Sequence, residues 1–356
     1  MFDLRSDTVT KPSKEVLQSA LDAELGDDEY IEDPTVNNLE NECAELLSFE
    51  KGLFVSSGLM GNQISLLIHN DPGTEVITPH DSHIKNYEHG AAAFLSRVQF
   101  RDAQNIDGEV DLEFIEKLIL KSKIHKPQIK TISIENTHLA SGGSVVPFDS
   151  IKALSDLTRR YDLKLHVDGA RIWHAILEDN NKNYGDYCDS LTFCFSKALG
   201  APIGSMLLGS KEFINEAREF RKKLGGGMRQ VGVIASMASK ALENRECILE
   251  DHAKAKKVYE FLLINLNNEK IESIVYKGTN MIFINIKSDE DPNKLLDIFY
   301  RNSINAGLIG DKSIRLVLHK DIPNEDIDDI SNRLLHSSSE FWFHSVIDFS
   351  DKFTNI

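Results

Sequence analysis

Asp168 and Lys197 are residue types that can take part in catalysis. Each stands at or just after the end of a short apolar segment that is typical of a buried strand. In the first segment, residues 163–168, apolar and polar side chains alternate as on a strand with two different faces. Gly169 ends this strand, so Asp168 stands at its carboxyl end, where ligands bind in open α/β sheets. Lys197 enters a loop rich in Gly, Ala and Pro. Taken separately, Asp168 also fits a helix N-cap and Lys197 a solvated loop charge.

The spacing of the pair favours a shared site. Asp168 and Lys197 are 29 residues apart, which suits one strand–helix–strand crossover, so they can lie at neighbouring strand ends. A desolvated lysine can attack an aldehyde as the neutral amine, and small residues beside it let a flat ligand approach the backbone. An aspartate can pair with a pyridine nitrogen and keep it protonated, which makes the ring an electron sink. Together they suggest pyridoxal phosphate as the cofactor.

The phosphate of such a cofactor needs a helix N-terminus, whose free N–H groups bind anions. Residues 56–62, Ser-Ser-Gly-Leu-Met-Gly-Asn, fit a turn from a strand into a helix with small residues at its start. They are the candidate phosphate loop.

Further motifs follow one another from residue 4 to about residue 330. They are Leu4–Pro12, Gly26–Tyr30 with Glu32–Val36, Glu135–His138, His166–Arg171, Ser196-Lys197 with Leu199-Gly200, Gly225–Gln230, and Arg315–Val317 with His319. In this combination the sequence resembles the L-threonine aldolases, pyridoxal-phosphate enzymes of the beta-eliminating lyase group that have the aspartate-aminotransferase fold. The resemblance covers nearly the whole chain, and several separate blocks in the right order make it specific.

The resemblance implies a cofactor site. It assigns cofactor binding to Gly58, Leu59, Met60, His83, Asp168, Arg171, Lys197, Lys222 and Arg229. Lys197 matches the lysine joined to the cofactor, Asp168 the partner of its ring nitrogen, and His83 the histidine stacked over the ring. Lys222 and Arg229 match basic residues near the phosphate that a neighbouring subunit contributes.

The resemblance also implies a substrate site and a reaction, the retro-aldol cleavage of L-threonine or L-allo-threonine to glycine and acetaldehyde. The substrate-binding residues would be Ser6, Tyr30, Tyr87, Arg171 and Arg315. Arg315 and Ser6 match groups that bind the substrate carboxylate, for which a planar guanidinium is suited. The two tyrosines match residues that come from, or border, the neighbouring subunit.

The reaction needs a base for the β-hydroxyl, and histidine suits that role because its reference pKa lies near neutrality. His83 is the first candidate; His125, which matches a family histidine near the substrate hydroxyl, is the second, and a bound water acting with either is another. His138 also fits a buried histidine with backbone partners. His80 and His83 are three residues apart without a third ligand, so no metal site is predicted. A cation near Thr8 and Thr10 stays open.

Other functions stay open beside this one. Another pyridoxal-phosphate lyase or aminotransferase that acts on a small amino acid would use the same scaffold, because fold does not fix chemistry. A non-catalytic paralogue that binds the cofactor is the second alternative. The preference between threonine and allo-threonine also stays open.

The elements that must position these residues alternate along the chain. Strands are predicted at 53–55, 76–78, 129–134, 163–167, 191–195 and 205–208, with helices near 13–23, 34–48, 59–69, 111–121, 149–160 and 211–223. This alternation predicts an α/β fold with a large, mostly parallel sheet. The resemblance makes it the fold of pyridoxal-phosphate-dependent transferases, known as fold type I.

A second, α+β domain is expected after a long or broken helix at 229–266. Its predicted strands are 273–276, 281–286 and 314–318, and its helices lie near 292–304 and 323–336. We therefore expect a large cofactor-binding domain at 1–250, which includes the N-terminal segment 1–12, and a small C-terminal domain at 251–356. The aromatic tail Glu340–His344 fits either a terminal segment packed on this domain or a contact with a partner or subunit.

The composition excludes several classes of protein. The 356 residues include 40 Lys and Arg against 56 Asp and Glu, a net charge of −16, which argues against a nucleic-acid partner because binding phosphates needs a basic surface. No run of about 18 apolar residues suits a membrane span, and the N-terminus has no apolar signal region, so a cytoplasmic protein is expected. The four cysteines form no Cys-x-x-Cys pair and are expected to be reduced. The resemblance adds a small amino-acid substrate and a homotetramer, a dimer of dimers with shared active sites.

Overall fold

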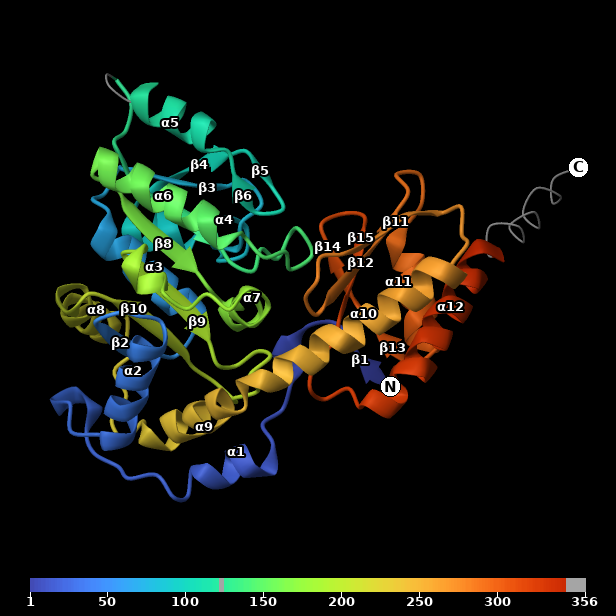
Figure 1. Ribbon diagram of the computed structural model, residues 1–356, viewed down its shortest axis with the longest axis horizontal. Coiled ribbons are helices and arrows are strands. Elements are labelled where there is room, and N and C mark those ends of the chain that lie inside the picture. Colours follow the sequence, from blue (N-terminus) through green and yellow to red (C-terminus); the bar gives the residue numbers. More distant parts are fainter. Residues whose placement is uncertain (122–124, 344–356) are drawn as a thin grey trace, which may run out of the picture. The chain divides into compact units, whose positions relative to one another are not determined.

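The computed structural model describes residues 1–121 and 125–343 of the chain. It divides into two compact units (Figure 1). The larger unit spans Lys11–Glu246, and the smaller one combines Met1–Thr10 with the chain from Cys247 onward.

A seven-stranded sheet organises the larger unit (Figure 1). Its strands, in spatial order, are β2 (Lys51–Val55), β10 (Ser205–Gly209), β9 (Ser190–Cys194), β8 (Lys164–Asp168), β7 (Ile129–Glu135), β3 (Glu75–Pro79) and β4 (Gln99–Ala103). Neighbours from β9 to β4 pair in parallel, whereas β10 is antiparallel to both β9 and β2. Six of these seven described strands therefore run in the same direction and end at one edge of the sheet.

Helices connect the strands and cover the sheet. In this unit they are α1 (Lys14–Ser19), α2 (Pro34–Leu46), α3 (Gly58–His69), α4 (His83–Asn86), α5 (Leu112–Lys121), α6 (Phe148–Tyr161), α7 (Ile172–Asp179), α8 (Lys211–Lys223) and α9 (Gly232–Glu243). α3 packs against β8, β9 and β10, and α8 packs against β2 and β10. Leu53 of β2 meets Ile64 of α3 and Ile214 of α8 in one buried apolar cluster. Burial of each such side chain stabilises the fold by roughly 1.5–3 kcal/mol.

The expected alternation of strands and helices, with a mostly parallel sheet, is confirmed. Several short elements were not expected, and β4 and α7 are two longer ones that the sequence did not indicate. β4 carries polar residues on an edge of the sheet, where Arg101 pairs with Glu75 of β3, so it lacks an apolar strand pattern. α7 buries Ile172, Trp173, His174, Ala175 and Ile176 and so lacks the one-sided pattern of a surface helix. The helix expected at 229–266 is divided by a 3₁₀ turn at Arg245–Cys247.

The smaller unit contains a four-stranded antiparallel sheet in the order β11 (Ile271–Tyr276), β12 (Met281–Ile286), β15 (Ser313–Val317) and β14 (Gly307–Ile309). α10 (Ile248–Asn265), α11 (Pro292–Arg301) and α12 (Ile327–Phe343) belong to the same unit. Its core includes Val258 of α10, Phe299 of α11 and Leu334 of α12, packed with Ile284 and Leu316 of the sheet.

The N-terminal segment lies in this smaller unit, which differs from the expected assignment of residues 1–12 to the large domain. β1 (Phe2–Asp3) pairs in parallel with β13 (Ile304–Asn305), and Leu4 is buried in the same apolar cluster as the helices. A two-residue strand is too short to give a sequence pattern, so this pairing had no signal.

The aromatic tail is described as far as residue 343, at the end of α12. Phe341 is fully buried, and its backbone oxygen accepts a hydrogen bond from Lys270 Nζ at 2.8 Å. Trp342 is partly exposed. The buried Phe341 agrees with a terminal segment packed on this domain. The contact with a partner or subunit stays a prediction, and His344 lies outside the described residues.

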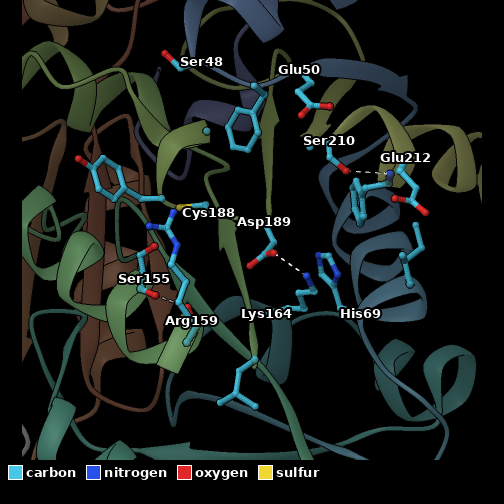
Figure 2. A pocket seen from close by; sticks show the side chains of 18 of the residues that line it. Ser48, Glu50, His69, Ser155, Arg159, Lys164, Cys188, Asp189, Ser210 and Glu212 are labelled. Carbon is cyan, nitrogen blue, oxygen red and sulfur yellow. Dashed lines mark hydrogen bonds and ion pairs between the residues drawn. The ribbon is translucent and has the colours of Figure 1, made fainter. Parts of the chain in front are cut away.

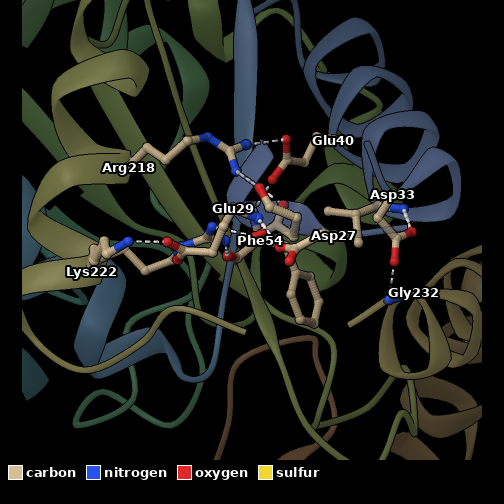
Figure 3. Close-up of polar contacts among 11 residues, drawn as sticks. Asp27, Glu29, Asp33, Glu40, Phe54, Arg218, Lys222 and Gly232 are labelled. Atoms are coloured by element: carbon tan, nitrogen blue, oxygen red, sulfur yellow. Dashed lines mark hydrogen bonds and ion pairs between the residues drawn. The ribbon is translucent and has the colours of Figure 1, made fainter. Parts of the chain in front are cut away.

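A buried cluster of ion pairs joins Asp28 to Arg218 and Arg221 of α8 (Figure 3). Arg221 donates hydrogen bonds to Asp28 and, at 2.7 Å, to the backbone oxygen of Phe54. Arg218 donates to Asp28 and to Glu40, each at 3.0 Å. Burial raises the pKa of Glu40, although the charge of Arg218 acts in the opposite direction. Removing one partner from such a cluster leaves an uncompensated buried charge.

We therefore expect Arg221→Leu to lower the free energy of unfolding by about 3 kcal/mol or more, because Asp28 stays buried with fewer donors. Urea unfolding at fixed protein concentration measures this change. Arg160→Ala is the control: Arg160 is well exposed and pairs with Glu116 at 3.1 Å, so its loss should cost less than about 1 kcal/mol. Equal losses in both variants would contradict the role given to the buried cluster.

Candidate active site

Reactive side chains gather where strands of the large sheet end. β2 leads into Ser57, β3 into His83 and β9 into Lys197, while β7 ends at Glu135 and β8 at Asp168. Because these strands run in the same direction, all five residues belong to the carboxyl edge of the sheet. β8 and β9 are neighbours, so Asp168 lies beside the strand whose following loop carries Lys197. This is the arrangement that the 29-residue spacing predicts.

Asp168 is a buried carboxylate with hydrogen-bond donors on both oxygens. The side-chain amide of Asn62, in α3, donates to Oδ2 at 2.9 Å, and the backbone N–H of Ala170 donates to Oδ1 at 3.1 Å. The side chain is almost inaccessible to solvent. A buried polar group is costly unless it is hydrogen-bonded, so these two donors offset the cost of burying the Asp168 carboxylate and fix its orientation.

His83 is held at its backbone and at its ring. Its backbone N–H donates to Glu135 Oε2 at 2.9 Å, and its Nδ1 lies 3.4 Å from Oε1 of the buried Glu88. An ionised carboxylate only accepts hydrogen bonds, so Nδ1 carries a proton and Nε2 is the nitrogen that remains for a reactant. The ring also lies against Tyr87, with ring centroids 5.7 Å apart.

Opposing effects act on the pKa of His83. Burial lowers it, but the hydrogen bond with Glu88 and the negative charge of Asp168 raise it, and the net pKa is raised. The charge of Lys197 lowers the same pKa, so this lysine also lies within electrostatic range of the ring. The structure thus brings together three of the residues that the sequence assigns to the cofactor.

Glu135, at the end of β7, binds backbone groups. It accepts hydrogen bonds from the backbone N–H groups of His83 and Leu139, at 2.9 and 3.0 Å. Burial raises its pKa, and the negative charge of Asp168 adds to this. The sequence singles out Glu135 only as part of a motif, whereas the structure makes it the group that fixes the start of α4.

The start of α3 fits a phosphate. A Cβ on Gly58 would lie 2.8 Å from Sγ of Cys194, so only glycine allows the helix to begin this close to β9. Ser205 Oγ, at the start of β10 and close to Gly58, is buried and has no hydrogen-bond partner among the described residues. A helix N-terminus beside a buried, unpaired hydroxyl suits an anion with several oxygen acceptors. Leu59, the second residue of α3, is exposed.

The other predicted site residues of the larger unit differ in their contacts and exposure. Lys222 pairs with Glu29 (Figure 3). Arg229 pairs with Asp27 at 3.0 Å, so both basic residues have acidic partners within the chain. Among the other predicted site residues, Tyr30 and Tyr87 are exposed and Met60 is half-buried. Arg171, just before α7, is buried.

His125 and His138 differ in their surroundings. His125 is exposed four residues before β7, and no contact among the described residues joins it to His83 or Asp168. His138 is fully buried, with Nδ1 2.8 Å from Ser141 Oγ and Nε2 3.5 Å from Asp81. Burial lowers the pKa of His138, but the contact with Asp81 outweighs this and raises it. His138 therefore has side-chain partners as well as backbone ones.

Two predicted substrate residues lie close together in the smaller unit. Arg315, in β15, donates from Nη2 and Nε to the backbone oxygen of Arg5, at 2.8 and 3.1 Å. Ser6 is the next residue, and its Oγ accepts a hydrogen bond from the backbone N–H of Thr8 at 3.2 Å. Within this unit, the pairing of β1 with β13 holds the segment that carries Ser6.

Asn62 and Glu88 are site residues that the sequence did not reveal. Asn62 donates to both Asp168 and Glu88, at 2.9 Å each, so it joins the two carboxylates. It lies four residues after Gly58, one helical turn on, and this spacing could have indicated it. Glu88 has no such signal, because it follows a short helix and a turn. Ligand atoms of His83, Glu88 and Asp168 lie within 4.8 Å of one another, close enough for a metal ion to bridge. The two carboxylates also lie close together because each accepts a hydrogen bond from the Asn62 amide.

A cavity of 660 Å³ lies at the opposite edge of the large sheet (Figure 2). Its lining includes Glu50, which precedes β2, Lys164, which begins β8, and Asp189, which precedes β9. These are the amino ends of the strands, so the cavity is separated from Asp168 by the length of β8. Lys164 pairs there with Asp189 at 3.0 Å.

Comparison with known proteins agrees with the motifs. The sequence model described as Beta-eliminating lyase matches residues 3–287. The probable low-specificity L-threonine aldolase 2 of Arabidopsis thaliana is 40% identical over 337 residues, 92% of this chain and 94% of that protein. The low specificity L-threonine aldolase of Escherichia coli (strain K12) is 37% identical over 335 residues, 93% of this chain and 97% of that protein. The resemblance expected from the motifs is confirmed.

The fold also agrees with solved structures. A structure of Leishmania major threonine aldolase superimposes with a TM-score of 0.79 at 17% identity, covering 94% of this chain and 98% of that one. The expected fold type I is therefore confirmed. Within residues 1–121 and 125–343, no helix combines the length and the apolar character needed to cross a lipid bilayer.

The raised pKa of His83 leads to a prediction. Glu88→Gln removes the negative charge beside Nδ1, so burial should then dominate and the pKa of His83 should fall. NMR titration of the His83 ring signal, assigned with His83→Gln, measures this. Glu116→Gln, which removes an exposed carboxylate, should leave the titration unchanged. A His83 pKa that stays the same or rises in Glu88→Gln would contradict the proposed contact.

Proposed function

Because the chain belongs to the beta-eliminating lyase family, we propose that it is a pyridoxal-phosphate-dependent lyase that splits L-threonine and L-allo-threonine into glycine and acetaldehyde. The observation that carries this is the gathering of Asp168, His83 and Lys197 at one sheet edge. It occurs in a chain 37–40% identical to proteins named L-threonine aldolase over almost its whole length.

The donor groups fit pyridoxal phosphate. Lys197 would supply the amine that holds the aldehyde carbon, and Asp168 would supply a partner for a protonated ring nitrogen. The N-terminus of α3 would supply N–H groups for the phosphate, with the Ser205 hydroxyl, unpaired among the described residues, beside it. His83 would cover the ring face, and Arg171 would bind near the ring oxygen. When bound, the cofactor withdraws the electron pair that the Cα–Cβ bond leaves on the substrate.

The chain's own residues would handle the proton of the β-hydroxyl. Glu88 holds Nδ1 of His83, so the lone pair for proton removal is on Nε2. When the hydroxyl proton moves to this base, the oxygen forms the carbonyl of acetaldehyde and the Cα–Cβ bond breaks. Returning a proton to Cα completes glycine. His125, or a water acting with either histidine, is the other candidate base.

Arg315 and Ser6 would bind the substrate carboxylate, with Arg171 near it. The planar guanidinium of Arg315 can donate two parallel hydrogen bonds to a carboxylate. Its two donations to the backbone oxygen of Arg5 fix its position beside Ser6 before any substrate arrives. This preorganisation supports binding without a large entropic cost.

Assembly and location form part of the proposal. Tyr30 and Tyr87 are exposed aromatic residues that match positions at a subunit boundary, and Lys222 and Arg229 match basic residues that serve a neighbouring site. We therefore propose a homotetramer, a dimer of dimers with shared active sites. We place it in the cytoplasm, because the four cysteines are free thiols, which suits a reducing compartment.

Lys197→Ala should abolish both the visible absorbance of the bound cofactor and the release of acetaldehyde from L-threonine. The expected loss of kcat is at least about 10³-fold, because the covalent link to the cofactor disappears. Lys164→Ala is the matched control, since this lysine lies at the opposite edge of the same sheet. Release of ammonia and a keto acid in place of acetaldehyde would favour another pyridoxal-phosphate reaction and overturn the aldolase proposal.

Arg315→Ala should raise KM for L-threonine about 10- to 100-fold, since a charge-assisted hydrogen bond contributes roughly 1.5–3 kcal/mol. The visible absorbance of the cofactor should stay unchanged, because Arg315 has no assigned contact with it. Arg301→Ala, which removes an exposed partner of Glu340, is the control. An unaltered KM in Arg315→Ala would remove Arg315 from the substrate site.

Sedimentation equilibrium tests the shared site. The active protein should sediment as a tetramer, and activity should fall on dilution below the dissociation constant of the assembly. A fully active monomer would contradict the roles given to Lys222 and Arg229.

A further inference from the structure

A line of hydrogen-bonded side chains runs between α3 and the large sheet and ends at Asp168. His69 Nε2 lies 2.8 Å from Ser190 Oγ, and the same oxygen lies 2.9 Å from His166 Nδ1. His166 Nε2 lies 3.1 Å from Asn62 Oδ1, and the Asn62 amide reaches Asp168. The two α3 residues in this line, Asn62 and His69, are seven positions apart and so face the same side of the helix.

The carboxylates fix the direction of every bond in this line. One nitrogen of Asn62 contacts both Asp168 and Glu88, which only accept, so that atom is the amide NH₂ and the oxygen faces His166. His166 must therefore donate from Nε2, which leaves Nδ1 as an acceptor for the Ser190 hydroxyl. Ser190 then accepts in turn from His69 Nε2. All the protons point toward the carboxylates.

Both histidines are neutral, as this direction requires. Burial lowers the pKa of His166 to about 4, although the charge of Asp168 acts in the opposite direction. Burial likewise lowers the pKa of His69 to about 3. A neutral imidazole has one donor and one acceptor nitrogen, which matches one donated and one accepted bond at His166.

The line is shielded from solvent. His166 and Ser190 are both fully buried. Polar groups there cost free energy unless each is paired, and an apolar filling would avoid that cost. The outer end is His69, which stacks on Phe213 and lines the cavity at the opposite sheet edge (Figure 2).

We propose that Asn62 and His166 are positioning residues that hold Asp168 oriented toward the ring nitrogen of the cofactor, an inference that rests on the proposed function. His166 orients the Asn62 amide through Oδ1, and the amide in turn donates to Asp168. Ser190 keeps the donor of His166 on Nε2. Without these donors the pairing of Asp168 with a protonated ring nitrogen would be weaker, which would lower the affinity for the cofactor and shift the pH midpoint of its visible absorbance upward.

The test uses the purified protein loaded with pyridoxal phosphate. Two readouts are the dissociation constant of the cofactor and the pH midpoint of its visible absorbance. Asn62→Leu should weaken cofactor binding at least tenfold and move the midpoint upward, and His166→Leu should do the same to a smaller extent. His166→Gln keeps a donor for Asn62 and should restore most of the loss.

Thr131→Val is the matched control. Thr131 is also buried on the sheet and donates to Asn70 at 3.0 Å, but it lies outside the line. It should lower the thermal midpoint of the apoprotein without moving either cofactor readout. Wild-type readouts in both Asn62→Leu and His166→Leu, or equal shifts in Thr131→Val, would overturn the proposal. If Asn62→Leu does not fold, the difference between His166→Leu and His166→Gln decides.

A measurement on the apoprotein separates this inference from the proposed function. Nitrogen-15 NMR of the histidine rings should show His166 neutral with its proton on Nε2. A proton on Nδ1 would overturn the line of donors whether or not the cofactor binds. A wild-type protein that takes up no pyridoxal phosphate, yet has the expected His166 tautomer, would instead overturn the proposed function.

Discussion

The structure of the site depends on one buried charge, the carboxylate of Asp168 at the end of β8. Such a charge needs hydrogen-bond donors, and the Asn62 amide and the Ala170 N–H supply them. Asn62 can do so only because α3 lies against β8 and β9, which in turn requires glycine at the point where the helix approaches Cys194. The start of the helix that stabilises Asp168 is therefore also the part of the fold that suits a phosphate.

The second carboxylate, Glu88, extends this constraint to His83, the proposed base. It accepts hydrogen bonds from Asn62 and from Gln63, and it faces Nδ1 of His83. A parallel sheet brings Asp168 and the loop of Lys197 to the same edge, but the sheet alone does not orient a histidine. Orientation comes from Glu135 at the backbone of His83 and Glu88 at its ring. The same set of contacts thus fixes the charge, the tautomer and the position of the groups at this edge.

Much of this was readable in the sequence, for identifiable physical reasons. Alternating apolar strands and helices predict the parallel sheet, and Asp168 and Lys197 stand out because a strand end followed by small residues is a local pattern. Asn62, Glu88 and the line through His166 were not found, because contacts between residues 24 to 106 positions apart leave no local pattern. The pairing of β1 with β13 was missed for the same reason, since two residues are too few to show a period. Side-chain roles taken from the resemblance, such as those of His125 and Arg229, remain predictions.

The central claim is that the carboxyl edge of the sheet holds pyridoxal phosphate on Lys197. The most direct measurement is to reduce the cofactor-loaded protein with borohydride, digest it, and locate the pyridoxyl group by mass spectrometry. The account predicts one such group per chain, on Lys197. A pyridoxyl group on another lysine, such as Lys164 at the opposite edge, with Lys197 unmodified, would contradict it.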